Sequence, residues 1–463
     1  MPISPARKIA FDVLRQVESE AAYASDLLHA RLIEDVRRED AALATELTLG
    51  VLRQRRLLDF LLERQLGKPL ASLDLEVLVA LRLGLYQVRF LARVPARAAV
   101  NESVELVKQA RKRSAAPLVN AVLRRVCEHA RQPLDEIVPP NLPLAERVGI
   151  LHSHPTWLVE RWLARYGEAQ TLALLEANNR APNLAGTVHD PARHDDAIRS
   201  LEGAGLHVEP GKLLRSAFIA QGGSPARTKA FRSGWISIQD EASQAIPLLL
   251  GVEASQRVLD LCAAPGGKTA TLALAAGEQA LVVAADRYSH RLRALRARLK
   301  RLRVGHVRTL ALDATSSLPF RVQFDRILVD APCSGTGTLS RNPEIRWRLR
   351  PEDLTEFHER QVAMLSRALE HLGPGGRLVY STCSLEAEEN EQVIERVLRG
   401  NRQVRAIPGK TAAEILAPHL AGRVEAAKLF DAQGFFRTFP PEQNTDGFFA
   451  AILEAVNSGH RVG

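Results

Sequence analysis

From about residue 240 onward, short apolar segments alternate with amphipathic ones. The predicted strands are 257–262, 280–285, 307–312, 324–330 and 377–381. The predicted helices, which follow most of these strands, are 268–276, 290–302, 354–372 and 388–398. Parallel strands need a crossover, usually a helix, so the resulting sheets carry helices on both faces. This part of the chain is therefore predicted to be an α/β domain. A last pair of segments, 435–439 and 447–453, predicts a hairpin that places an antiparallel strand at the end of the sheet.

The first 130 residues have a different pattern. Apolar side chains recur at helical spacing, for example at Ile9, Val13, Leu14 and Val17, whereas Gly and Pro are sparse. We therefore expect an all-α domain of several helices. A Pro-rich stretch after it is typical of a linker, and the next segment mixes helical and strand-like patterns. The predicted organisation is a helical domain at 1–132, a linker at 133–144, a small α+β domain at 145–235 and the α/β domain at 236–457.

Composition excludes several classes of protein. The chain has 463 residues, of which 46% are apolar and 25% charged, so disordered, collagen-like and coiled-coil proteins are excluded. None of the four cysteines forms a C-x-x-C pair, so neither a zinc ribbon nor any other metal site is predicted. The sequence has neither an apolar run of the ~20 residues that a membrane span needs nor a signal peptide, and we expect a cytoplasmic protein. The net charge of +9 is typical of a protein with a polyanionic partner.

A glycine-rich loop follows the first predicted strand of the α/β domain. The residues are Ala263, Ala264, Pro265, Gly266, Gly267, Lys268 and Thr269, and a helix comes next. Such a loop lets the backbone approach a ligand and directs N–H groups at an anion. A Walker A loop would need glycine where Cys262 stands, and a G-x-G-x-x-G fingerprint is absent. A plain strand-to-helix turn remains the alternative, although it explains one glycine better than the sequence Pro-Gly-Gly.

Acidic residues stand at the ends of three further strands. Asp286 closes the second strand, Asp313 follows the third and Asp330 ends the fourth. Ligands of open α/β sheets bind outside the carboxyl ends of the strands, and an acid after the second strand can bind ribose hydroxyls. One such acid is often only a turn residue. Three of them beside a glycine loop predict a nucleoside-bearing cofactor with a cationic centre.

Two cysteines follow neighbouring strands in a similar way. Cys333 comes after the fourth strand and Cys383 after the fifth, so the two thiols should meet at one edge of the sheet, beside the glycine loop. A thiolate is a good nucleophile when a positive charge or a helix N-terminus lowers its pKa, and the helix expected near Glu388 could supply that field. The alternative is that both are small buried hydrophobes. Cys262, in the loop, is expected to pack there, and Cys127 is expected to be structural.

Four motifs resemble those of the RNA cytosine-5 methyltransferases, which use S-adenosylmethionine. They are DLCAAPGGKT (260–269), DAPCSGTGTLSRNPEIRW (330–347), YSTCSLEAEENE (380–391) and DGFFAAIL (446–453). The segment at 234–243 resembles the approach to that family's catalytic domain. The N-terminal segments 6–14, 100–108 and 119–124 resemble the NusB-like RNA-binding domain. The combination is similar to the bacterial RsmB (Sun/Fmu) subgroup, which methylates small-subunit (16S) ribosomal RNA. It implies a NusB-like all-α domain, a small α+β domain and a Rossmann-like class I methyltransferase domain.

The resemblance also implies a role for each site residue. Asp286 would hold the ribose of S-adenosylmethionine, Asp313 would lie near the adenine, and Asp330 would lie between the cofactor and the target base. Cys383 would be the nucleophile, and Cys333 would assist product release. The methionine part would be lined by Cys262, Ala263, Ala264, Pro265, Gly266, Gly267 and Lys268. The target cytosine would be single-stranded or flipped out of its stack. We expect a monomer.

The positive charge is concentrated in one segment. Residues 285–308 contain nine basic residues against Asp286 alone. Leu292, Leu295, Leu299 and Leu302 mark one helix face, and arginines cover most of the rest. The segment is predicted to contact RNA phosphates through Arg293, Arg296 and Arg301. The alternative is the solvated outer face of a helix that covers the sheet.

Several functions remain open at this stage. The leading hypothesis is a cytosine-5 methyltransferase of ribosomal RNA, and the nearest alternative is one that acts on transfer RNA. A different class is an RNA-binding, antitermination-like factor with a decayed catalytic domain, but the intact glycine loop, three acids and two cysteines argue against decay. A methyltransferase of small molecules would not explain the helical extension or the paired cysteines.

Overall fold

The computed structural model describes residues 3–20, 22–32, 36–129, 132–401 and 403–456. The chain divides into two compact units. The helical unit consists of residues 1–181 together with 339–349, and the sheet unit consists of residues 182–338 together with 350–463. The predicted domain limits at residues 1 and 457 lie outside the described residues. The four-part division of the sequence stays a prediction, because these units are defined by contacts rather than by family boundaries.

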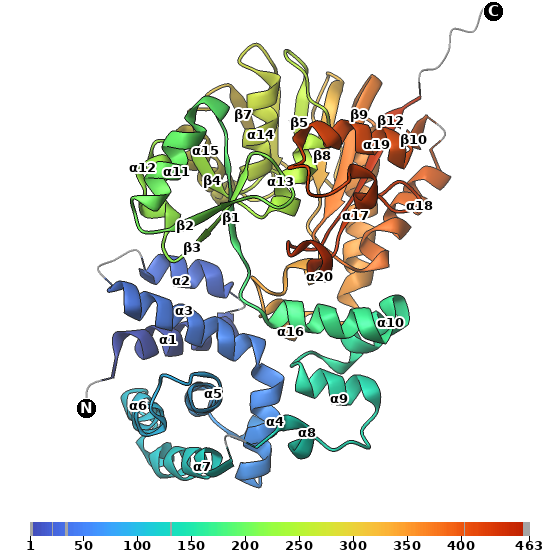
Figure 1. Cartoon of the computed structure of the whole chain (residues 1–463). Coiled ribbons are helices and arrows are strands. Elements are labelled where there is room, and N and C mark those ends of the chain that lie inside the picture. The colour runs from blue at the N-terminus through green and yellow to red at the C-terminus, as the bar shows by residue number, and fades with distance from the viewer. Residues whose placement is uncertain (1–2, 21, 33–35, 130–131, 402, 457–463) are drawn as a thin grey trace, which may run out of the picture. The chain divides into compact units, whose positions relative to one another are not determined.

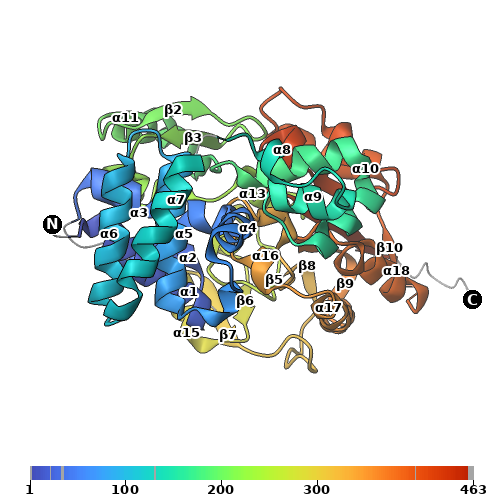
Figure 2. The same cartoon turned by 90° about the horizontal axis from the view of Figure 1, so that it is seen from below.

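The helical unit begins with seven α-helices that share one apolar core (Figures 1 and 2). In α1 the buried residues include Ala10, Leu14 and Val17, whose spacing of three to four residues forms a single face. The prediction of an all-helical N-terminal region is confirmed. The helices are α1 (Pro5–Glu20), α2 (Ala24–Leu32), α3 (Arg38–Arg53), α4 (Arg55–Leu66), α5 (Leu75–Phe90), α6 (Ala96–Gln109) and α7 (Ala116–His129).

Three more helices and one distant segment complete the helical unit. The expected linker contains α8 (Leu134–Ile137), and α9 (Leu144–Leu151) begins at its end. The next helix, α10, spans Thr156–Asn179, and Pro155 stands at the position just before its first turn. Gly167, with φ of 75°, kinks α10. The distant segment, residues 339–349, contains the short helix α16 (Ile345–Arg348).

The sheet unit begins with a small antiparallel sheet of strand order β2-β3-β1-β4. Its strands are β1 (Leu184–Val188), β2 (His207–Pro210), β3 (Ala217–Gln221) and β4 (Ile236–Ile238), and its helices are α11 (His194–Glu202) and α12 (Lys229–Arg232). Val188, Leu201 and Phe218 share its core. These helices and strands agree with the mixed helical and strand-like patterns of this segment of the sequence.

The large sheet has eight strands in the order β10-β12-β9-β8-β5-β6-β7, with β11 paired to β12. All pairings among β5 to β9 are parallel, which confirms the predicted parallel sheet. From β5 the chain proceeds to β6 and β7 on one side and then returns to β8 and β9 on the other. The five strands are β5 (Val258–Asp260), β6 (Val282–Asp286), β7 (Val307–Ala311), β8 (Phe324–Asp330) and β9 (Leu372–Thr382).

The C-terminal hairpin differs in one respect from its prediction. Strands β11 (Phe436–Thr438) and β12 (Phe448–Ala455) are antiparallel, as expected. However, β12 does not lie at the end of the sheet, because it pairs with β9 on one side and with β10 (Val404–Ala406) on the other. The three residues of β10 are too few to form a period-two pattern, so this added strand has no signal in the sequence.

Helices cover both faces of the large sheet (Figure 1). Side chains of each strand alternate between the two faces: Val258 packs with one helix layer and Leu259 with the other. One layer is formed by α13 (Glu241–Leu248), α14 (Gly267–Ala276), α15 (Ser289–Arg301) and α19 (Gly409–Leu416), and the other by α17 (Asp353–Leu369) and α18 (Glu391–Arg399). A further short helix, α20, spans Pro440–Gln443. In the described part of the chain, no helix is both long and apolar enough to span a membrane.

Candidate active site

The glycine loop lies at the point where the strand order of the large sheet reverses. It follows β5, which has β6 on one side and β8 on the other, and a ligand crevice forms at such a point. Gly266 has φ of 96°, a conformation that favours glycine, and a Cβ atom there would lie 3.0 Å from Cγ of Leu295. The helix α14 begins at Gly267, so its free N–H groups belong to the loop.

A cavity of about 230 Å³ opens beside this loop. Asp260 and Asp330 bring negative charge to its wall, and Lys268 and Arg298 bring positive charge. The other lining residues are Ile238, Gln239, Ser243, Cys262, Ala263, Ala264, Pro265 and Gly267. Of the residues predicted for the cofactor loop, all but Gly266 line the cavity. The arrangement suits a ligand that carries both signs of charge.

Asp330 lies at the centre of the polar contacts around the cavity. Its Oδ2 atom is 2.7 Å from Nζ of Lys268, and its Oδ1 accepts a hydrogen bond of 2.7 Å from Oγ of Ser381. The three residues come from the ends of β8 and β9 and from the first turn of α14. Lys268 thus neutralises a carboxylate beside the cavity, which is a different role from that of the lysine in a phosphate-binding loop.

Asp286 and Asp313 also lie at strand ends, but neither lines the cavity. Asp286 is almost fully buried, and its oxygens accept hydrogen bonds from N of Ala264 at 3.3 Å and N of Tyr288 at 3.1 Å. It therefore fixes the glycine loop to the end of β6. Asp313 accepts hydrogen bonds from N and Oγ1 of Thr315, and these hydrogen bonds lower its pKa. Sequence reasoning placed both acids correctly at strand ends.

The two strand-end cysteines meet. Sγ of Cys333 and Sγ of Cys383 are 3.4 Å apart, because β8 and β9 are parallel neighbours that end at the same edge. The contact with Cys383 and burial raise the pKa of Cys333 well above its usual value. A sulfur pair at this distance shares one proton in a hydrogen bond, so Cys333 suits the protonated partner. The helix expected near Glu388 as a source of positive field, α18, begins only at Glu391.

Glu389, which the sequence did not single out, joins the two cysteine loops. Its carboxylate is fully buried and accepts hydrogen bonds from N of Ser334 at 2.8 Å, from Oγ of Ser384 at 2.5 Å and from Nε2 of Gln361 at 3.0 Å. It also accepts one from Oγ of Ser334. Ser334 follows Cys333 and Ser384 follows Cys383, so one carboxylate holds both loops. The acidic run after Ser384 was a signal, but sequence alone does not say which acid is buried.

A close backbone approach joins the same loops a second time. N of Gly337 donates to O of Cys383 at 2.9 Å, and N of Gly447 donates to O of Gly337 at 2.8 Å. A Cβ atom on Gly337 would lie 2.1 Å from O of Gly447, so only glycine fits there. The loop that carries Cys333 is therefore fixed to the Cys383 loop and to the C-terminal hairpin.

Asp260 is a second residue that the sequence analysis did not single out as part of the site. It ends β5, is buried, and accepts a hydrogen bond of 2.7 Å from Oγ1 of Thr269. Its Oδ1 atom has no hydrogen-bond partner among the described residues. Burial raises the pKa of Asp260 to about 7, so the carboxyl binds a proton more readily than an exposed one. Its signal in the sequence was its place in the strand before the loop.

The basic residues of the segment at 285–308 lie in different environments. Some of its arginines have structural contacts: Nη1 of Arg301 donates to O of Phe231 at 2.6 Å and to O of Ile236 at 2.9 Å. Arg298 lines the cavity. Arg293 and Lys300, by contrast, are exposed on the outer face of α15. The choice of Arg301 as a phosphate contact is therefore corrected, because two backbone carbonyls hold its guanidinium.

Two cysteines lie outside the pair. Cys262 lines the cavity, and burial together with the neighbouring carboxylates raises its pKa well above the usual value. Cys127 packs against the core of the helical unit. Within the described ranges, no group of three or more His, Cys, Asp or Glu side chains could hold a metal ion.

Comparison with known proteins now adds to this geometry. The chain matches the NusB family over residues 4–128, the ferredoxin-like domain of RsmF/B-like methyltransferases over 154–226, and the 16S rRNA methyltransferase RsmB/F family over 247–454. It is 31% identical to the probable ribosomal RNA small subunit methyltransferase B of Bacillus subtilis over 457 residues, which are 98% of this chain and 99% of that protein. The chain belongs to the RsmB/F methyltransferase family. A second relative, ribosomal RNA small subunit methyltransferase B of Erwinia tasmaniensis, is 34% identical over 459 residues, 96% of this chain and 98% of the relative.

Solved structures share the fold of this chain. The crystal structure of the protein PH0851 covers 98% of this chain and 99% of its own, with a TM-score of 0.81 and 25% identity. That of a methyltransferase homologue from Pyrococcus horikoshii covers 68% of this RsmB/F chain and 100% of its own, with a TM-score of 0.57 and 29% identity. The predicted fold class is confirmed: a helical NusB domain, a small ferredoxin-like domain and a mixed-sheet methyltransferase domain.

Proposed function

We propose that this protein methylates carbon 5 of a cytosine in 16S ribosomal RNA through a covalent bond to Cys383. The observation that carries the proposal is the pair of thiols, Cys333 and Cys383, held 3.4 Å apart at the strand ends beside Asp330. If the atom that accepts the methyl group were already nucleophilic, the enzyme would need no thiol to activate it. Two thiols in contact suit a reaction that needs a nucleophile first and a base afterwards.

The cavity suits S-adenosylmethionine, which supplies the methyl group. This cofactor carries a sulfonium and an amino-acid group. The cavity wall presents both carboxylates and basic groups, including Oδ1 of Asp260, which has no hydrogen-bond partner in the part of the chain that the structure describes. We propose that residues 262–268 hold the methionine part. Asp286, at the end of β6, would bind the ribose hydroxyls, and Asp313, after β7, would lie near the adenine.

Cys383 performs the first step in this proposal. Carbon 5 of cytosine is a weak nucleophile, so its ring must first be activated. The Cys383 thiolate adds to carbon 6, forming an S–C6 bond, and the electrons of the C5=C6 bond move into the ring toward N3. Carbon 5 then becomes electron-rich and takes the methyl group. Asp330, carrying a proton, donates it to N3 and so stabilises the added charge. Lys268, 2.7 Å from Asp330, then balances the carboxylate that is left.

Cys333 takes part in the final step. The hydrogen on carbon 5 must leave as a proton, its bonding electrons restore the C5=C6 bond, and the S–C6 bond breaks to free Cys383. We assign the removal of this proton to Cys333, acting directly or through a water. Its raised pKa makes its thiolate a strong base once its own proton has left. The reacting base must be single-stranded or flipped out, since neither cysteine could reach carbon 6 within a stacked duplex.

The choice of 16S ribosomal RNA rests on the family and on its helical domain. The matched relatives are named as small subunit ribosomal RNA methyltransferases, and the NusB match adds an RNA-binding type of domain. We propose that the protein acts as a monomer in the cytoplasm, where bacterial ribosomes are assembled. Bisulfite sequencing of ribosomal and transfer RNA from a deletion strain tests the substrate: loss of one 16S cytosine supports the proposal, and loss of a transfer RNA site contradicts it.

Substitution of single cysteines tests the mechanism. Cys383→Ala should abolish both methylation and the formation of a covalent protein–RNA adduct, because the nucleophile is gone. Cys333→Ala should accumulate the adduct, which denaturing gels detect, and slow turnover by about 100-fold or more. Cys127→Ala, in the helical unit, is the matched control and should keep full activity. Normal turnover by Cys383→Ala would overturn the assignment of the nucleophile.

A further inference from the structure

One short segment belongs to the helical unit although the chain on both sides of it belongs to the sheet unit. Residues 339–349 are grouped with the helices, whereas residues up to 338 and from 350 onward belong to the sheet unit. Cys333 precedes this segment by six residues. Peptide bonds thus connect the loop that carries Cys333 directly to a segment held by another unit.

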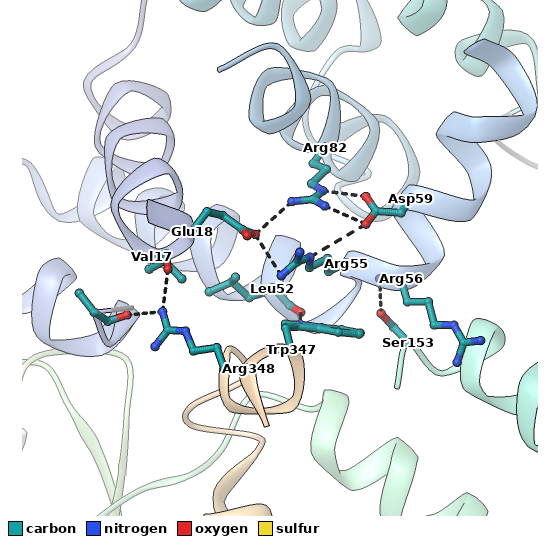
Figure 3. A network of polar contacts seen from close by, with 11 residues as sticks. Val17, Glu18, Leu52, Arg55, Arg56, Asp59, Arg82, Ser153, Trp347 and Arg348 are labelled. Atoms are coloured by element: carbon teal, nitrogen blue, oxygen red, sulfur yellow. Dashed lines mark hydrogen bonds and ion pairs between the residues drawn. The ribbon is translucent and has the colours of Figure 1, made fainter. Parts of the chain in front are cut away.

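Trp347 and Arg348 attach the segment to helices α1 and α3 (Figure 3). Nε1 of Trp347 donates to O of Leu52 at 2.8 Å. Nη2 of Arg348 donates to O of Val17 at 2.7 Å, and also to O of Ala22 at 2.7 Å. Val17 and Leu52 lie in the last turns of α1 and α3, where carbonyls have no partner within the helix, and Ala22 lies between α1 and α2. The segment therefore supplies donors to backbone carbonyls of the helical unit.

An ion network orders the surface on which Trp347 lies. The guanidinium of Arg55 lies 5.6 Å from the centre of the Trp347 ring, in cation–π contact. Arg55 pairs with Glu18 at 3.2 Å, and the buried Arg82 pairs with Glu18 at 3.1 Å and with Asp59 at 2.7 Å (Figure 3). Because Arg82 is buried and bound to two carboxylates, the network is costly to rearrange.

Arg346 is the residue of the segment whose position is most strictly constrained by burial and hydrogen bonds. Its side chain is fully buried and donates to O of Ser153 at 3.1 Å, to Oδ1 of Asn179 at 2.9 Å and to O of Asn178 at 3.1 Å. Burial lowers its pKa to about 9. A buried guanidinium is tolerated only where its hydrogen bonds are made, so a shift of the segment by an ångström would be unfavourable. The helical unit thus fixes one end of the Cys333 loop.

We propose that the helical unit is a positioning device for Cys333. It holds residues 339–349, and through the peptide bond at 338 it sets the place of the loop at 331–338. Glu389 and Gly447 fix the same loop from within the sheet unit. Cys333 is then held between two anchors, and removal of either would slow the release step more than the methyl transfer. The kinetic part of this inference rests on the proposed function of Cys333.

Two substitutions in the full chain test the inference. Trp347→Phe keeps an aromatic ring but loses the bond to Leu52, and Arg348→Met loses both carbonyl contacts. We expect faster hydrogen exchange at residues 334–338 and a covalent adduct that decays roughly 10- to 100-fold more slowly, with unchanged affinity for S-adenosylmethionine. Arg348→Lys, which keeps a donor, should restore part of the rate.

Arg7→Met is the matched control. Arg7 is a buried arginine of α1 that binds Gln87 at 2.6 Å and Glu102 at 2.9 Å, both within the helical unit and neither in residues 339–349. It should lower the unfolding temperature without changing hydrogen exchange at 334–338 or decay of the adduct. If the Trp347 and Arg348 variants behave like Arg7→Met, the inference is overturned.

Adduct trapping by Cys333→Ala tests the proposed function, whereas hydrogen exchange at residues 334–338 tests this inference independently. If Cys333→Ala traps no adduct, the role of Cys333 in release fails, yet the hydrogen exchange at 334–338 still decides whether the helical unit positions the loop. If Cys333→Ala traps the adduct but both segment variants exchange and react as the wild type does, only the inference fails.

Discussion

Three of the cysteines have a raised pKa. Burial and nearby carboxylates raise the pKa of Cys127 and Cys262, whereas the hydrogen bond to Cys383 and then burial raise that of Cys333. A thiol with a raised pKa is a poor nucleophile at neutral pH, because the thiolate is the reactive form. These three thiols are therefore disfavoured as nucleophiles.

Sequence reasoning predicted the pair of cysteines but not the groups that hold it. Cys333 and Cys383 could be placed together because parallel neighbouring strands end at one edge. Glu389 could not be selected from its acidic run, because its burial depends on Ser334 and Gln361, which are 55 and 28 residues away. Such long-range contacts leave no periodic signal in the sequence.

Asp260 should make stability depend on pH between about 4 and 7. Its pKa is raised from 3.8 to about 7 in the folded protein, so folding favours the protonated carboxyl. The stability it contributes is fully present below pH 4 and is lost as pH rises toward 7, by up to about 4 kcal/mol. We therefore expect Asp260→Asn to gain stability relative to the wild type as pH rises from 4 to 7. Thermal unfolding across this range measures the difference, and a constant difference would contradict the prediction.

Glu389→Gln should loosen both cysteine loops. The amide group would replace one acceptor oxygen by a donor that faces the hydroxyl and N–H donors of Ser334 and Ser384. The loss should cost about 1–3 kcal/mol of folding free energy and reduce methylation strongly. Glu395→Gln, on the exposed face of α18, is the control and should change neither. Denaturant unfolding and methyl incorporation measure the two effects.

At the level of elements, α15 combines structural and exposed basic residues. The sequence showed its apolar face correctly: Leu292, Leu295 and Leu299 are buried in the core of the sheet unit. It could not show that Arg301 would bind backbone carbonyls of another segment, since this depends on how α12 and β4 pack. Charge density alone therefore located the basic helix but could not distinguish its structurally bound arginine from its exposed basic residues.

Charge reversal on the exposed face of α15 should weaken RNA binding. Arg293 and Lys300 lie seven residues apart on one face of the helix and are exposed. The variant with Arg293→Glu and Lys300→Glu should bind RNA less tightly and reduce the salt dependence of log K by about 2, with unchanged affinity for S-adenosylmethionine. Filter binding at several salt concentrations measures both quantities.

Arg301→Glu serves as the contrasting variant. It removes the donors to O of Phe231 and O of Ile236, so its main effect should be a lower unfolding temperature. If the double variant binds RNA like the wild type, the outer face of α15 is only a solvated surface.

At the scale of the whole molecule, the contact units do not follow the order of the sequence. The NusB, ferredoxin-like and methyltransferase matches are consecutive, and the sequence motifs predicted them in that order. Residues 339–349 lie inside the methyltransferase match but belong to the helical unit. No composition or periodicity distinguishes this segment, because its burial depends on Leu52, Val17 and Ser153.

If the chain is divided after residue 181, the two fragments should associate through residues 339–349. A fragment of residues 182–463 would carry Arg346 and Trp347 without their partners, so it should be poorly soluble alone. Co-expressed with residues 1–181, it should bind that fragment and copurify with it. Trp347→Ala in the larger fragment should abolish copurification, whereas Glu395→Gln should not. Copurification that is unaffected by Trp347→Ala would show that other contacts join the fragments.

Residues 339–349 also make the folding of the helical unit depend on the progress of translation. The ribosome makes the first 181 residues early, but the helical unit lacks Arg346 and Trp347 until about 170 residues later. At roughly 5–20 residues per second, this interval lasts about 10–30 s. During this interval, the side chains that donate hydrogen bonds to O of Leu52 and O of Val17 have not yet been synthesised. The yield of folded protein should therefore respond to the speed of translation between codons 181 and 349 more than to its speed elsewhere.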